Sequence, residues 1–163
     1  MTNDNALRLT LRSQRLGQDE GGHNEWQVMT TEVALDPAQT ALILCDVWDK
    51  HWSRGATERV NQMVPRMNEV VVALRTRGVQ IIHAPSDTMA FYAGTPARQR
   101  MIDAPPVEPP PPLEHADPPL PVDASDQGSD TGEASWYKAW SRQHPGIEID
   151  QERDGITDNG HEV

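Results

Sequence analysis

Residues 40–46 read Thr-Ala-Leu-Ile-Leu-Cys-Asp, a short apolar run that ends on an acid. An apolar run of this length with little alternation is typical of a strand that is covered on both faces, as in a parallel sheet. A carboxylate placed where such a strand stops lies at the edge of the sheet where α/β proteins bind their ligands. The stretch therefore predicts a parallel α/β sheet and makes Asp46 a candidate active-site acid.

The next segment has the pattern of a helix followed by a second strand. Apolar residues recur at three- and four-residue steps between residues 56 and 77, as on one face of an amphipathic helix. Residues 79–83, Val-Gln-Ile-Ile-His, then read as a strand. The three elements predict one βαβ unit with parallel strands and a right-handed crossover, which brings Asp46 towards His83 and Ser86.

The N-terminal region has a different period. Leucine alternates with polar residues over residues 7–11, and Trp26 and Val28 repeat this spacing after a gap that contains glycine. A period of two is typical of half-buried strands. Residues 1–34 are therefore predicted to form a β-ribbon that precedes an α/β domain of residues 35–163.

A proline-rich and acidic insertion interrupts the α/β domain at residues 104–134. Nine of the fourteen prolines lie within residues 104–122, so we expect this segment to have little regular structure. A short helix is predicted near residues 95–102 and a short strand at residues 147–149. Residues 156–163 have the pattern of a helix that begins but does not finish, so the domain is expected to be incomplete at its C-terminus.

The charge and hydropathy of the chain argue against some classes of binding partner. The 163 residues include 25 acidic and 14 basic side chains, a net charge of -11 that opposes binding to nucleic acid and to anionic membranes. No apolar stretch approaches the roughly 18 residues that span a bilayer, so a soluble, cytoplasmic protein is expected. Cys45 is the single cysteine, which excludes an intrachain disulfide and favours a small core residue.

This order of features resembles the isochorismatase-like, or cysteine hydrolase, superfamily, which includes nicotinamidases. The likeness rests on the apolar-Asp-x-x-Asp block of residues 42–49, on Asn68 in the predicted helix, and on residues 79–86, a strand that leads into a loop. It is good from about residue 30 to 90, weak after residue 135 and absent from the insertion. The resemblance implies a three-layer, Rossmann-like parallel-sheet domain that hydrolyses a small amide-like substrate, with Asp46 as the base and no cofactor.

Two departures from the family pattern bear on catalysis. The family nucleophile is a cysteine at a helix N-terminus in a Gly-x-x-Thr-x-x-Cys-like segment, and this chain has no such segment, since Cys45 lies inside the first predicted strand. The family's assisting lysine has no clear equivalent, because the lysines are Lys50 and Lys138 and the expected stretch carries Arg153. We interpret the chain as the N-terminal portion of a family member, inactive alone.

The candidate site residues each have a second interpretation. Asp46 is either the general base of the hydrolase or a strand-end acid that caps the following loop. Trp48 and Trp52 either form a wall of a substrate pocket or pack in the core. His83 and Ser86 are candidate substrate-binding residues because the predicted topology brings them to the same edge.

A metal site is a further hypothesis. Asp49 and His51 have the one-residue offset that some nicotinamidase-type metal sites use, and His83 and Asp87 could add ligands for a divalent transition metal. The alternative is a solvated charged loop in which His51 takes part in a salt bridge.

Two other classes of protein are alternatives to the hydrolase. Phosphohydrolases of the haloacid dehalogenase type need an Asp-x-Asp pair around Mg²⁺, whereas the spacing here is Asp46-x-x-Asp49. A non-catalytic α/β binding or scaffolding module would instead use the proline-rich insertion as a ligand loop for an aromatic-lined groove. The expected partner is a small-molecule substrate, and assembly into a homo-oligomer stays open.

Overall fold

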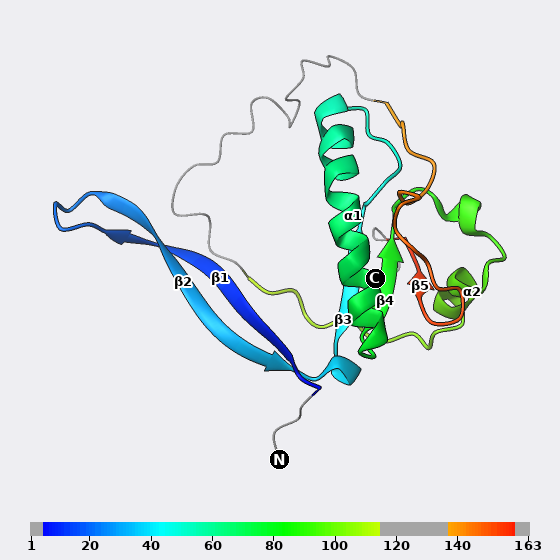
Figure 1. The fold of residues 1–163 in the computed structure, drawn as a ribbon, viewed down its shortest axis with the longest axis horizontal. Helices are drawn as coiled ribbons and strands as arrows, with labels where there is room; N and C mark the ends of the chain where they lie inside the picture. The colour runs from blue at the N-terminus through cyan, green and yellow to red at the C-terminus, as the bar shows by residue number, and fades with distance from the viewer. Residues whose placement is uncertain (1–4, 115–136, 159–163) are drawn as a thin grey trace. The chain divides into compact units, whose positions relative to one another are not determined.

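A computed structural model describes residues 5–114 and 137–158 (Figure 1). The chain divides into two compact units, one of residues 1–36 with 108–124 and the other of residues 37–107 with 125–163. The first unit contains a two-stranded antiparallel sheet and the second a three-stranded parallel sheet with helices. The predicted α/β class is confirmed at this general level.

The first unit is a long β-hairpin. Strand β1 (Leu7–Gln18) pairs with strand β2 (Asn24–Leu35) along their whole length, as the β-ribbon prediction required. The turn is closed by Asp19, whose carboxylate accepts hydrogen bonds from the backbone N–H groups of Gly21 and His23, each at 2.9 Å.

The second unit is built on the predicted βαβ unit. Strand β3 (Ala41–Cys45) is followed by helix α1 (Arg54–Thr76) and strand β4 (Gln80–Ala84), and β3 and β4 are adjacent and parallel. Helix α1 begins where the Ser53 side chain accepts a hydrogen bond from the Ala56 N–H. The topology predicted from the hydrophobic pattern is therefore confirmed.

The rest of the second unit is made of short elements. They are two 3-10 helices (Pro37–Gln39 and Met89–Tyr92), helix α2 (Pro96–Ile102) and strand β5 (Gly155–Ile156). Helix α2 confirms the helix predicted near residues 95–102. Strand β5 continues the sheet on the far side of β4, so the order is β3-β4-β5.

Two predictions for the C-terminal region were wrong. Residues 147–149 do not form a strand: Ile147 is buried, but its N–H bonds to the His144 carbonyl in a turn. The strand lies at Gly155 and Ile156 instead, where a helix was predicted to open, because Ile156 packs in the core against Tyr92 and Ala97. The predicted helix also included residues 159–163, which lie outside the described residues.

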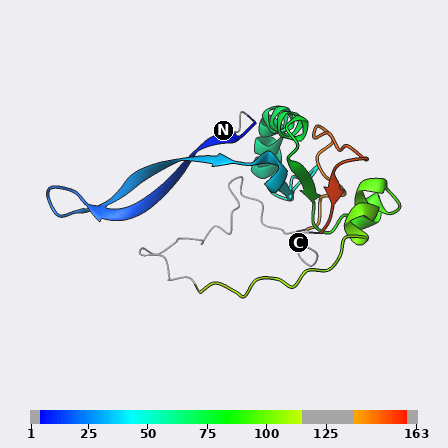
Figure 2. The same ribbon diagram turned by 90° about the horizontal axis from the view of Figure 1, so that it is seen from below.

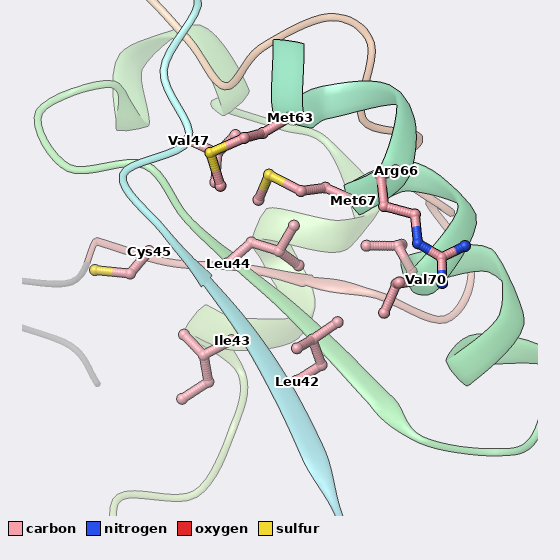
Figure 3. Close-up of a pocket in the computed structure, with 10 residues that line it drawn as sticks. Leu42, Ile43, Leu44, Cys45, Val47, Met63, Arg66, Met67 and Val70 are labelled. Carbon is pink, nitrogen blue, oxygen red and sulfur yellow. The ribbon is translucent and has the colours of Figure 1, made fainter. Parts of the chain in front are cut away.

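The prediction that β3 is covered on both faces was also wrong for the described residues. Leu44 is buried, whereas Ile43 is 46% exposed and Cys45 is exposed, so the prediction of a core cysteine fails as well. The alternation of strand side chains explains the difference, since Leu42 and Leu44 point toward α1 while Ile43 and Cys45 project from the other side (Figure 3).

An apolar groove of about 520 Å³ runs between β3 and α1 (Figure 3). Its lining residues come from the first strand with the loop after it and from one face of the helix: Leu42, Ile43, Leu44, Cys45, Val47, Met63, Arg66, Met67, Val70 and Val71. Within the described part of the chain β3 pairs only with β4, so its other edge is open along this groove.

The proline-rich insertion is described only in part. Residues 105–114 form neither helix nor strand, in agreement with the prediction, and residues 115–134 lie outside the described residues. None of the helices in the described ranges is long and apolar enough to cross a membrane.

A buried polar network holds the C-terminal segment to the sheet. The Arg75 guanidinium donates to both carboxylate oxygens of Asp154, at 2.9 and 2.6 Å, and His83 Nε2 lies 3.0 Å from Oδ2 of the same carboxylate. All three side chains are at most 4% exposed. Burial alone would raise the pKa of Asp154, but the hydrogen bonds from His83 and Arg75 outweigh it and hold the pKa well below its usual value.

His83 therefore lies in the core and not at the open edge where a substrate-binding role was predicted. Its side chain is fully buried, and its second ring nitrogen, Nδ1, lies 3.0 Å from the Gln143 side-chain oxygen. Both ring nitrogens are engaged by protein groups, and the residue is not among those that line the cavity beside Asp46.

Candidate functional site

Asp46 lies where β3 ends, in an unusual backbone conformation. Its φ of 53° places it in the left-handed region, which non-glycine residues seldom adopt but which aspartate tolerates better than most. Its N–H donates to the Ala84 carbonyl at 3.1 Å, so the parallel pairing of β3 and β4 continues to this residue. Such conformations often occur at functional sites, because surrounding contacts must hold them.

The Asp46 side chain joins the two loops that follow β3 and β4. Its Oδ1 accepts hydrogen bonds from the N–H of Ser86 at 3.0 Å and from the Ser86 hydroxyl at 2.7 Å. The indole N–H of Trp48 donates to the Ser86 carbonyl at 3.2 Å. Three predicted site residues are thus brought together: Asp46, Trp48 and Ser86.

A cavity of about 130 Å³ opens beside this carboxylate. It is lined by side chains from the loop after β3 and from the first turns of α1: Asp46, Trp48, Lys50, His51, Ala56, Thr57 and Val60. Because one water molecule occupies about 30 Å³ in the liquid, the cavity accommodates only a small molecule. It combines one carboxylate, one ammonium group and aromatic surface, which suits a small polar ligand with a flat apolar part.

The aromatic wall of the cavity is a stack of rings. Trp48 lies on Trp140, with ring centroids 4.2 Å apart and planes 11° from parallel, and the His51 ring is nearly parallel to both at 5.9 Å. Trp52 meets the His51 ring at a tilt of 37° and is not among the residues that line the cavity. Trp48 therefore both packs and lines the cavity, so the two interpretations of this residue are compatible.

His51 is fixed as a neutral imidazole by the start of helix α1. The backbone N–H of Ser53 donates to His51 Nδ1 at 3.1 Å, so the ring proton is on Nε2. Burial lowers the pKa of His51, which also favours the neutral ring. The backbone N–H of His51 donates to the Thr57 hydroxyl at 2.9 Å, which anchors this loop to the helix.

The Asp49 carboxylate anchors the loop after β3 to a distant segment of the chain. Its carboxylate accepts hydrogen bonds from the Ser141 N–H at 2.9 Å, the Ser141 hydroxyl at 2.7 Å and the Arg142 N–H at 3.4 Å. Burial would raise the pKa of Asp49, but the bonds from Ser141 outweigh it and the pKa is lowered.

The predicted metal ligands are not gathered in one place. His83 bonds to Asp154 and Gln143 in the core, and the Asp87 N–H donates to the Asp158 carboxylate at 3.0 Å. Over residues 5–114 and 137–158, no group of three or more histidine, cysteine, aspartate or glutamate side chains is arranged to hold a metal ion.

The basic residues divide between the cavity and the surface. Lys50 lines the cavity, a role that its position directly after Asp49 in the sequence did not indicate. Lys138 is exposed and donates to the Asp87 carbonyl. Arg153 lies at the surface, 2.7 Å from Asp150, and does not reach the site.

The sequence did not indicate that residues 140–144 complete the site. Trp140 is buried, but its ring partners could not be predicted from spacing. The backbone of Trp48 pairs with that of Gln143, and the His144 N–H donates to the Val47 carbonyl at 2.7 Å.

Comparisons with protein-family models, curated proteins and solved structures find no match. The site is therefore interpreted from its own geometry.

Proposed function

We propose that this chain carries the acid-bearing part of a hydrolase site of the isochorismatase-like, cysteine hydrolase type, in a three-layer α/β domain. The observation that carries the proposal is the Asp46 carboxylate, which is fixed by Ser86 at the end of the first parallel strand and lines a cavity with an aromatic wall. Trp48 would contact the flat part of a small amide-like substrate, and Lys50 would lie near its polar end.

In the proposed reaction Asp46 accepts the proton of a cysteine thiol, and the thiolate attacks the amide carbonyl carbon. The amine then leaves with a proton, and water hydrolyses the resulting thioester. Cys45 does not suit the role of this nucleophile, because it lines the apolar groove while Asp46 lines the separate cavity. The proposal therefore assigns the nucleophile to further polypeptide, and the groove beside β3 is a surface on which such polypeptide could pack.

Binding of nicotinamide as a probe amide tests this proposal. In ¹⁵N-resolved NMR of the full chain, nicotinamide should shift the indole signal of Trp48 and the backbone signal of Ser86. Asp46→Asn keeps an oxygen that can accept from Ser86 but removes the charge, so we expect binding to weaken about tenfold, or ~1.4 kcal/mol. Cys45→Ala is the matched control and should bind as the wild type does.

The same chain should release no ammonia from nicotinamide. Turnover that Cys45→Ala abolishes would contradict the proposal, since the chemistry would then have to involve the first strand. Shifts that avoid the cavity residues Trp48 and His51 would contradict it as well.

A second candidate function is a non-catalytic α/β binding or scaffolding module. The observation that favours it is the open apolar groove, which is larger than the cavity at Asp46, about 520 against 130 Å³. In the NMR experiment this function predicts no response to nicotinamide at Trp48 and no effect of Asp46→Asn.

A further inference from the structure

The cavity at Asp46 contains two hydrogen-bond donors that meet no acceptor in the described part of the chain. The cavity lies where the loop after β3 reaches the first turns of helix α1, which covers one side of the parallel sheet (Figures 1 and 2). The donors belong to two of its lining residues, Lys50 and His51. A ligand that fills the cavity is therefore expected to supply acceptors.

The first donor is the Nε2–H group of His51. The Ser53 N–H donates to His51 Nδ1 at 3.1 Å, so Nδ1 is the accepting nitrogen and the proton of the neutral ring is on Nε2. Over residues 5–114 and 137–158, no group accepts a hydrogen bond from Nε2. A protonated Nε2 has no lone pair to offer a metal ion, so the group that meets it has to be a hydrogen-bond acceptor.

The second donor is the ammonium group of Lys50. It makes no ion pair or hydrogen bond with any residue of the described ranges, whereas Lys138 donates to the Asp87 carbonyl. A lysine ammonium is a compact positive charge with three donors. Together with the His51 ring it offers two sets of donors and one positive charge, which match the two oxygens and the single negative charge of a carboxylate.

The aromatic stack indicates the shape of the ligand. The His51 ring is 12° from parallel to the Trp48 ring, and its Nε2–H bond lies in the ring plane, so a hydrogen bond from Nε2 runs nearly parallel to the face of Trp48. A flat ligand on this face would meet the N–H at its edge. Oxygens of sp² type accept close to the plane of their own substituents. This geometry favours a carboxylate joined to a flat group over a tetrahedral anion such as phosphate.

We propose that the cavity at Asp46 binds a small planar carboxylate, whose oxygens accept hydrogen bonds from His51 Nε2–H and from the Lys50 ammonium group. Asp46 repels this carboxylate, so the charged end of the ligand should lie on the Lys50 side of the cavity. The inference rests on the proposed function for the use of this cavity as a binding site. It adds that the substrate is a small planar amide that also carries a carboxylate.

Benzoate and benzamide are matched probes, because they have nearly the same shape and neither has a ring nitrogen that could accept from His51. In ¹⁵N-resolved NMR titrations of the full chain, benzoate should shift the indole signal of Trp48. It should bind at least about fivefold more tightly than benzamide, because hydrogen bonds to a charged acceptor are roughly twice as strong as those to a neutral one. Equal binding of the two probes overturns the proposal, as does tighter binding of inorganic phosphate.

The role of Lys50 is tested by Lys50→Met, which keeps most of the aliphatic stem and removes the charge. This substitution should abolish the preference for benzoate over benzamide. Lys138→Met is the matched control, because it removes the same charge from a side chain that does not line the cavity. A preference that survives Lys50→Met overturns the assignment, and so does a preference that both substitutions abolish.

The role of His51 is tested by two amide substitutions that both remove the ring from the stack. His51→Asn places an oxygen where Nδ1 accepts from Ser53 but leaves no donor at the position of Nε2, whereas His51→Gln carries an N–H donor near that position. Benzoate binding should weaken at least about tenfold in His51→Asn and clearly less in His51→Gln. Equal losses would show that the ring matters only for packing, and would overturn the role of Nε2–H.

Asp46→Asn separates this inference from the proposed function. Loss of the negative charge should strengthen benzoate binding, whereas the same substitution is expected to weaken nicotinamide binding. A carboxylate preference without a response to nicotinamide would contradict the proposed function and leave this inference intact. Nicotinamide binding without a carboxylate preference would overturn this inference alone, and the absence of Trp48 shifts with every probe would overturn both.

Discussion

Replacing Asp154 by asparagine is expected to lower the free energy of unfolding by about 3–5 kcal/mol. Asp154 is the carboxylate to which Arg75 donates twice and beside which His83 is buried. Without its charge the guanidinium of Arg75 stays buried, and the counter-charges that remain are Asp150 and Glu148, whose side chain is 59% exposed. A small domain has a total stability of about 5–15 kcal/mol, so the second unit should be largely destabilised.

Urea denaturation followed by circular dichroism measures this change, with Glu69→Gln as the control. Glu69 pairs with Arg66 at 2.7 Å, but both side chains are well exposed, at 66% and 79%, so its loss should cost well under 1 kcal/mol. The lowered pKa of Asp154 means that its contribution is present above the ordinary carboxyl pKa and is lost as the pH falls below about 4. Equal effects of the two substitutions would show that the buried network contributes little.

Trp140→Ala is expected to have the second largest effect, about 3–5 kcal/mol. The Trp140 ring is 8% exposed and stacks on Trp48 and His51, so its removal leaves a hole behind the wall of the cavity. The loss should appear in urea denaturation and in the near-ultraviolet circular dichroism of the stacked indoles. Nicotinamide binding should weaken along with it, because the orientation of Trp48 depends on the stack.

Tyr137→Ala is the matched control for this substitution. Tyr137 is an aromatic residue of the same segment, but it is 56% exposed and does not belong to the stack, so its removal should change stability by less than about 0.5 kcal/mol. If Trp140→Ala were as mild as Tyr137→Ala, the stack would not be what holds residues 140–144 to the loop after β3.

The elements that could be predicted from the sequence are those with a local signal. The run of residues 41–45 and the helical period of residues 54–76 specify β3 and α1 without reference to the rest of the chain. Strand β5 is only two residues long, too short for any period to reveal it. Its position depends on the packing of Ile156 against Tyr92, a contact between distant parts of the sequence.

The candidate site could also be predicted only in part from the sequence. Asp46, Trp48 and Ser86 meet because they follow adjacent parallel strands, which the topology alone implies. His83 follows the same rule but lies in the core, because its carboxylate partner Asp154 is 71 positions away in the sequence. Asp49 likewise finds its partners 92 and 93 positions away, so spacing could not distinguish a loop anchor from a metal ligand.

The open edge of β3 also affects the tendency of the chain to aggregate before folding is complete. Strand β3 (Ala41–Cys45) carries neither charge nor proline, and within the described ranges it pairs with β4 alone and borders an apolar groove. Edges of this composition recruit strands from other unfolded chains, and natural proteins usually protect them with lysine or proline. During synthesis this segment would be a preferred binding site for chaperones, and in concentrated preparations it would be the point from which aggregation starts.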